Sequence, residues 1–218
     1  MIKCSHINIC AESAFSPSQQ QLNIINKCIG SGKERTLTLE GISLNKDATK
    51  SFFEIVPIEV LNMNSCFAND NQLQLVCDSL MNQTNLREIL LATNNITSLG
   101  CSAIGRLLNK INCVEILDLS GNPIELGTIF DCLSSNKSLI SLDMREVKLK
   151  ATAYESLCNC LKTNQTLTSI NISLNPASEK EGHFLKEAFR ENFSITEFRI
   201  TGNQFGIANE REICLGYI

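Results

Sequence analysis

Hydrophobic residues recur along the chain in short alternating runs, and each run breaks at a polar position. The stretch CVEILDLSGNPIEL places Val114, Leu117 and Leu119 before Asn122 and Ile124. Alternation at a period of two over so short a span predicts a half-buried β-strand. The asparagine after it predicts a sharp inward turn, in which its amide hydrogen-bonds to buried backbone groups.

The same pattern returns along the whole chain, which predicts a repeat architecture. Its first positions fall at residues 4, 34, 58, 86, 114, 139, 167 and 195, and a spacing of 28 residues recurs. The turn position holds asparagine in most units, with cysteine or valine in two others: Asn94, Asn122, Asn175, Asn203, Cys66 and Val147. Stacked asparagines are expected to form a polar ladder inside the core.

The segments between the predicted strands carry hydrophobic pairs four residues apart, a spacing that places both on one face of a helix. The pairs are Val76 and Leu80, Ile104 and Leu108, Ile129 and Leu133, Leu157 and Leu161, and Leu185 and Phe189. Predicted helix N-caps are Asp70, Thr152 with Glu155, and Ser178 with Glu181. Asn136, Asn164 and Asn192 are predicted to end helices in the left-handed conformation.

Each unit is therefore a strand, a turn and a helix, and it buries its apolar face only by stacking on its neighbours. The fold class is α/β, a right-handed solenoid of about seven to eight repeats with a parallel concave sheet and outer helices. We expect one domain over residues 1–218, with a degenerate repeat or cap at 1–33, repeats at 34–206 and a short C-terminal segment at 207–218.

Composition narrows the class further. A net charge of −4 and a pI near 5.3 disfavour a nucleic-acid surface, which needs clustered Lys and Arg. No apolar run approaches a membrane span and no secretory signal is recognisable, so neither a membrane nor secretion is expected. The 11 cysteines are an odd, scattered set without CxxC, which predicts reduced thiols and a cytoplasmic location.

These repeats resemble those of leucine-rich repeat proteins, and the 28-residue unit with a full helix is similar to the ribonuclease-inhibitor-like class. That class includes the Ran GTPase-activating protein, NOD-like receptor sensor domains and ciliary dynein-regulatory subunits. The resemblance covers residues 34–206 and implies a fold. It implies no single function, because one scaffold hosts many tasks.

No catalytic motif accompanies the repeats. The two histidines, His6 and His183, are expected on a strand and on a helix as surface or partly packed residues. No Walker, HExxH, GxSxG or GxGxxG pattern occurs. We therefore expect no enzymatic activity, no cofactor, no metal and no small-molecule substrate.

The concave face is where a partner protein is expected to bind, because every second strand residue points away from the core. Val60, Leu90 and Ile116 form an apolar diagonal, and acidic residues lie beside it, a combination typical of protein interfaces. The candidate binding residues are Val60, Asn62, Glu88, Leu90, Ile116, Asp118, Asp143, Arg145, Glu197 and Arg199.

The sequence thus favours a non-enzymatic protein-interaction module or scaffold. Three alternatives stay open: a structural subunit of a large assembly such as a ciliary dynein-regulatory complex, a small-GTPase regulator, and a bacterial effector with eukaryotic-like repeats. The hypothesis of a small-GTPase regulator follows from the resemblance to the Ran GTPase-activating protein, but this sequence shows no acidic tail like that of the Ran activator.

Overall fold

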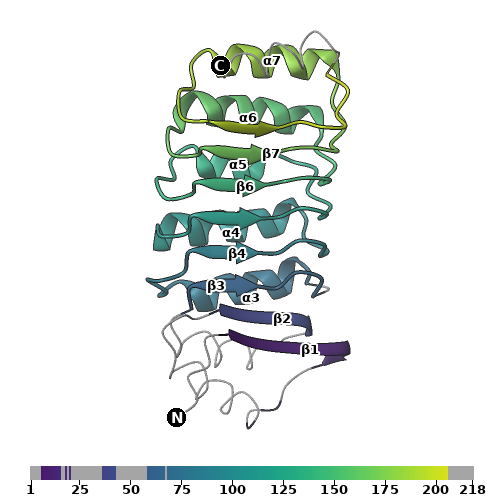
Figure 1. Cartoon of the computed structure of the whole chain (residues 1–218), viewed down its shortest axis with the longest axis vertical. Helices are drawn as coiled ribbons and strands as arrows, with labels where there is room; N and C mark the ends of the chain where they lie inside the picture. Colours follow the sequence, from purple (N-terminus) through teal and green to yellow (C-terminus); the bar gives the residue numbers. More distant parts are fainter. Residues whose placement is uncertain are drawn as a thin grey trace.

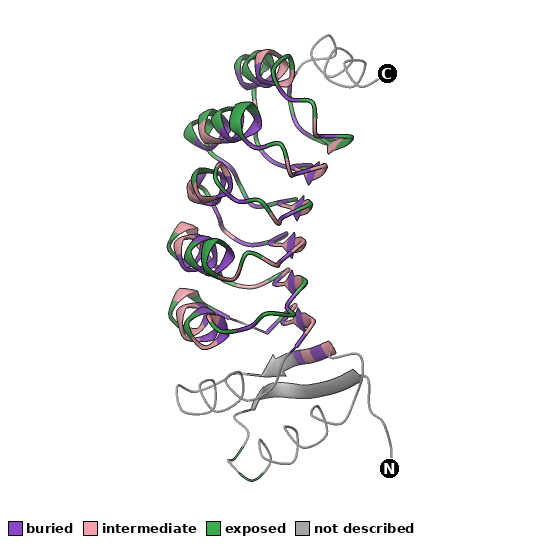
Figure 2. Ribbon diagram, turned by 90° about the vertical axis from the view of Figure 1, so that its left-hand side faces the viewer, coloured by how far each residue is buried: buried purple, intermediate pink, exposed green. Residues whose placement is uncertain are grey.

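The computed structural model describes residues 6–15, 18, 20, 36–42, 58–66 and 68–205. Eight parallel strands form one sheet in chain order, β1-β2-β3-β4-β5-β6-β7-β8. Figures 1 and 2 show the two layers that follow from this order, with the strands on one side and helices α3 to α7 on the other. The predicted α/β solenoid with a parallel sheet is the observed architecture of the described residues.

The strands from β3 onward are three residues long, and the helices between them differ in length. The strands are β1 His6–Phe15, β2 Thr36–Ile42, β3 Val60–Asn62, β4 Glu88–Leu90, β5 Ile116–Asp118, β6 Ser141–Asp143, β7 Ser169–Asn171 and β8 Glu197–Arg199. The helices are α3 Asp70–Leu80, α4 Ser98–Ile111, α5 Thr128–Leu133, α6 Ala151–Thr163 and α7 Glu179–Phe189.

The central residue of each short strand points into the core. Leu61, Ile89, Leu117, Leu142 and Ile170 are at most 2% exposed, and they pair in register across the sheet. Both members of each predicted helix pair are buried, except Phe189, which is half-buried. Helix α5 has only 6 residues. It belongs to the unit that begins at residue 114, which is 25 residues long instead of 28, so the shorter unit has the shorter helix.

The predicted asparagine ladder is confirmed. The Asn122 side-chain amide donates to Leu91 O and Leu119 O, both at 2.9 Å, and its oxygen accepts from Ile96 N at 3.1 Å. Asn94, Asn175 and Asn203 likewise donate to a carbonyl of the preceding unit. Cys66 takes this position with a hydrogen bond from its thiol to Leu39 O.

Val147 has no side-chain donor or acceptor, so one step of the ladder lacks its hydrogen bond, and a backbone carbonyl serves as the acceptor instead. In the other units, an amide such as Ile96 N donates to the asparagine of the next unit. At the equivalent position, Ile124 N donates instead to Asn122 O at 2.8 Å. The buried amide therefore keeps a partner, as buried backbone groups require.

A second ladder runs along the helix C-termini, and the sequence did not reveal it. Asn164 ends α6, but its φ of −85° is not left-handed, and neither Asn136 nor Asn192 has positive φ. That part of the prediction is wrong. Instead the Asn164 amide donates to Leu133 O at 2.7 Å, and its oxygen accepts from Leu167 N at 2.9 Å. Asn136 and Asn192 repeat this arrangement, and Gln83 occupies the same position earlier in the chain.

The predicted helix caps are partly wrong. Asn69, not Asp70, caps α3, in a capping box with Gln72. Helix α6 begins at Ala151 with Lys150 as N-cap and no side-chain cap bond, so the predicted box of Thr152 with Glu155 does not form. The box at Ser178 is confirmed: its backbone N–H donates to the Glu181 carboxylate at 2.8 Å.

The turn after each strand from β3 to β8 passes through the left-handed region at one fixed repeat position. The residues are Ser65, Thr93, Gly121, Glu146, Leu174 and Gly202, with φ between 54° and 78°. Non-glycine residues are disfavoured there by contact between Cβ and the backbone, so four of these six turns carry local strain. Lys148 adds a further left-handed residue, at φ 60°.

Six described cysteines have free thiols: Cys77, Cys101, Cys113, Cys132, Cys158 and Cys160. These six agree with the prediction of reduced thiols, whereas Cys4, Cys28 and Cys214 lie outside the described residues. No helix in the described ranges is long and apolar enough to cross a membrane.

Candidate functional site

The face of the sheet opposite the helices, here called the open face, carries the predicted binding residues. In each strand from β3 to β7 the first and third residues point to this face while the second is buried. The helices in the described part of the chain all lie on the other side (Figure 2). The alternation predicted from the sequence therefore places the candidate residues as expected.

Their exposure differs from the expectation. We expected Leu90 and Ile116 to be exposed, but they are less exposed than that: both are half-buried, as is Val60. For comparison, Leu99 on α4 is 76% exposed and Leu126 is 47% exposed. Parallel strands stand about 4.8 Å apart, so neighbouring side chains on one face shield each other.

The strand register corrects the predicted apolar diagonal. Val60 pairs with Glu88, and Glu88 pairs with Ile116, so a carboxylate stands between the two aliphatic side chains in one row. Leu90 lies in the next row, between Asn62 and Asp118. Aliphatic and acidic side chains are therefore interleaved in one surface, here called the mixed patch, which consists of Val60, Glu88, Ile116, Leu90 and Asp118.

Two of the acidic residues also have a structural role that the sequence analysis missed. One oxygen of Asp118 accepts from Ser120 N at 2.9 Å, and one oxygen of Asp143 accepts from Arg145 N at 2.9 Å. Asn62 and Asn171 make the same bond two residues ahead. Asp or Asn at the last strand position of these four units was the signal for this turn.

Asp143 and Asn171 are also joined across the sheet. The Asn171 amide donates to the second oxygen of Asp143 at 3.0 Å. On the other side, Asp143 pairs in register with Asp118 on β5. Two carboxylates thus stand side by side, an arrangement that is unfavourable without a neutralising partner.

The last two predicted residues lie at the far end of the sheet and bind each other. Arg199 donates to the Glu197 carboxylate at 2.8 and 2.5 Å. Ser169 donates to the other oxygen at 2.8 Å. The hydrogen bonds from Ser169 and Arg199 lower the pKa of Glu197. The candidate residues on β3 and β4 lie at least four strands away from β8, so the structure does not bring Glu197 and Arg199 to the mixed patch.

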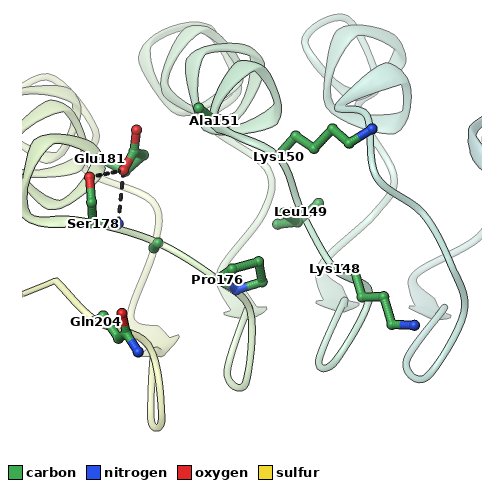
Figure 3. Close-up of a pocket in the computed structure, with 9 residues that line it drawn as sticks. Lys148, Leu149, Lys150, Ala151, Pro176, Ser178, Glu181 and Gln204 are labelled. Atoms are coloured by element: carbon green, nitrogen blue, oxygen red, sulfur yellow. Dashed lines mark hydrogen bonds between the residues drawn. The ribbon is translucent and has the colours of Figure 1, made fainter.

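An open hollow of about 510 Å³ lies between the loops that lead into α6 and α7, and no feature of the sequence analysis predicted it. Figure 3 shows Lys148 and Lys150 pointing toward the preceding repeat, away from Gln204 and Ser178. Lys150 forms an ion pair there with Glu125. The lysines do not converge on the hollow, so it offers no concentrated positive charge.

Glu181 at the edge of this hollow serves helix α7. Burial disfavours its charge, but hydrogen bonds from the Ser178 hydroxyl and backbone outweigh that effect and lower its pKa. Its carboxylate is thus committed to the capping box. Within the described ranges, no group of three or more His, Cys, Asp or Glu side chains is arranged to hold a metal ion.

No family model matches the chain. It is 24% identical over 159 residues to "NACHT, LRR and PYD domains-containing protein 4E" of Mus musculus, a match that covers 67% of this chain and 16% of that protein. The "Centrosomal protein of 78 kDa" of Mus musculus is 22% identical over 195 residues, covering 73% and 24%. The chain therefore spans less than a quarter of the length of these relatives.

Two solved structures are also similar. The tropomodulin C-terminal domain of Caenorhabditis elegans has a TM-score of 0.49 at 10% identity, covering 79% of this chain and 91% of that one. Leiomodin-1 Actin-Binding Site 2 has a TM-score of 0.48 at 15% identity, covering 79% and 84%. The alternating strands and helices and the similarity to a protein whose name includes LRR together support leucine-rich repeat character for this chain.

Proposed function

We propose that the chain is a non-enzymatic protein-interaction module that binds a partner protein on its open face. We further propose a right-handed solenoid of the ribonuclease-inhibitor-like class, with one domain over residues 1–218 and a cytoplasmic location. The observation that carries the binding proposal is the mixed patch. Val60, Leu90 and Ile116 keep aliphatic surface in water on a face that carries no helix in the described part of the chain.

The physical argument concerns what the monomer gains from these side chains. Aliphatic surface left in water contributes nothing to folding, whereas covering it with a partner contributes about 25 cal/mol per Å². Because these side chains are already half-buried, covering one of them yields only part of that free energy, so several must be covered together. A patch that spans adjacent strands meets this need, because its members lie within one partner's footprint.

The test compares the wild-type chain with Leu90→Ser combined with Ile116→Ser. Each chain of 218 residues captures proteins from cells of its own organism, and the captured protein is then purified and its affinity measured directly. We expect the double variant to keep the wild-type circular dichroism spectrum and to lose the purified partner. Equal affinity for both chains would place the interface elsewhere.

A matched control removes aliphatic surface outside the patch. Leu99→Ser with Leu126→Ser makes the same chemical change at two more exposed positions on the helix side. This control should bind the partner as the wild type does. A loss in the control equal to that in the patch variant would also contradict the proposal.

A structural subunit of a large assembly is the second candidate. The observation in its favour is the similarity to the Centrosomal protein of 78 kDa, whose name places that protein in an organelle-scale assembly. Phe193, which is 87% exposed beside the last described strand, offers apolar surface for such packing. Loss of binding in Phe193→Ser but not in the patch variant would favour this candidate.

A further inference from the structure

The acidic side chains of the open face divide into a neutralised and an unneutralised group. Glu197 at the β8 end is paired with Arg199. Glu88, Asp118 and Asp143 on β4 to β6 form no salt bridge with any described residue. Two cations lie near them: Arg87 is paired with Glu115, and Arg145 extends from the turn after β6 without a described ion pair.

The two aspartates are held in place before any partner arrives. Each is fixed by its bond to the backbone two residues ahead, at 2.9 Å in both cases. A cation that binds them therefore pays little to order their side chains. It also relieves the repulsion between carboxylates that stand in register on β5 and β6.

The aliphatic side chains lie on the adjoining strands. Val60, Leu90 and Ile116 come from β3, β4 and β5, one from each strand. Neighbouring strands are about 4.8 Å apart, and an α-helix rises about 5.4 Å per turn. A helix laid across the strands would thus offer roughly one side chain per turn to each strand.

We infer, on the basis of the proposed function, that the part of the open face from β3 to β6 binds a basic amphipathic helix of a partner protein. Aliphatic side chains of that helix contact Val60, Leu90 and Ile116. Lysine or arginine side chains one or two turns further along bind Asp118 and Asp143, and Glu88 attracts a further cation. The β7 to β8 end contributes less, because its charges are already paired.

The experiment uses the full chain and three fluorescent 18-residue probe peptides. One is an amphipathic helix of leucine and lysine, the second replaces every lysine with glutamate, and the third is a scrambled, non-amphipathic leucine–lysine sequence. Fluorescence anisotropy at 50 and 300 mM salt gives the affinities. We expect saturable 1:1 binding of the first peptide only, at least tenfold weaker at the higher salt.

The decisive variant is Asp118→Asn with Asp143→Asn, because Asn62 and Asn171 already make the same turn bond at this position. The turn bonds should therefore survive, while two charges and the bond from the Asn171 amide to Asp143 are lost. The leucine–lysine peptide should bind at least tenfold more weakly. The matched control is Asp131→Asn with Glu155→Gln on the exposed helix side, which should bind as the wild type does.

The outcomes separate this inference from the proposed function. Equal weakening in both variants, or equal binding of the scrambled peptide, would mean general attraction by an acidic protein and would overturn the inference. Binding of the leucine–glutamate peptide that Leu90→Ser with Ile116→Ser abolishes would keep the open face as an interface but reject a basic partner. Absence of binding by any peptide would also reject it, and the partner-capture experiment would still decide the proposed function.

Discussion

The carboxylate of Asp70 on α3 binds the N-terminus of the next helix: it accepts a hydrogen bond from Thr97 N at 2.8 Å. Its other oxygen accepts from the Thr97 hydroxyl at 2.6 Å, and Gly100 N donates to the first oxygen at 3.0 Å. Helix N-termini favour negative charge because their first N–H groups lack partners in the helix. A residue in one repeat thus caps the helix of the following repeat.

Asp70→Ala should therefore destabilise the chain, by about 1–3 kcal/mol, because it leaves buried or half-buried donors without an acceptor. Urea-induced unfolding followed by circular dichroism measures the change. Asp78→Ala, on the exposed side of the same helix, is the control and should change stability by less than about 0.5 kcal/mol. Equal effects of the two changes would contradict a capping role for Asp70.

Asn122→Leu should destabilise by about 1–3 kcal/mol for each backbone group that loses its partner, since Ile96 N and Leu91 O both bond to this side chain. The equivalent position in the next unit is Val147, which has no such bonds, so Val147→Leu is the matched control. It should show only the cost of the added methylene. A neutral Asn122→Leu in denaturant unfolding would refute the ladder.

Leu117→Ala should cost about 2–5 kcal/mol, because it removes methylene groups from a close-packed core. Leu117 has no exposed surface and lies in register between Ile89 and Leu142. Thermal and urea unfolding give the change in free energy. A cost below that of the half-buried Ile116→Ala would show that the central strand residues do not dominate the core.

Leu174→Gly should stabilise the chain by roughly 1 kcal/mol, because Leu174 has a φ of 58° and an L side chain is strained there. The converse change, Gly202→Ala, should destabilise: Gly202 has φ +78°, and a Cβ would come within 2.5 Å of Leu174 Cδ2. Differential scanning calorimetry compares the two. A destabilised Leu174→Gly would mean that packing of its side chain outweighs the backbone strain.

Stability should fall as the pH rises above about 9. Burial raises the pKa of the Cys77, Cys158 and Cys160 thiols to about 12, whereas unfolding returns them to their ordinary value of 9.0. Below that value the thiols are protonated in both states and stability is unaffected. Between about pH 9 and 12 only the unfolded chain ionises, so the free energy of unfolding decreases.

Urea melts at pH 7, 9 and 10.5 measure this loss. Burial raises the pKa of Tyr154 in the same direction, so wild-type data alone do not isolate the thiols. Cys77→Ala combined with Cys160→Ala should lose less stability between pH 9 and 10.5 than the wild type does. An identical slope in the variant would assign the pH dependence to other groups.

The sequence by itself determined the repeat, the strand positions and the core-facing side chains. Leu117 and Ile89 are buried because alternation at a period of two leaves each strand one apolar central residue. Asn122 was identifiable as a turn residue because a polar side chain recurs there within an apolar pattern. These features depend on spacing within one unit, which a single sequence displays directly.

The tertiary structure alone decided which polar groups meet across units. Asp70 was predicted to cap its own helix, yet it binds Thr97 in the next unit. Asn164 was predicted to be left-handed, yet it donates to Leu133 O, 31 residues earlier. Glu88 was placed beside the aliphatic patch, yet it lies between Val60 and Ile116. Hydrogen-bond partners and patch composition depend on the register between stacked units, and this register is fixed only when their cores pack together.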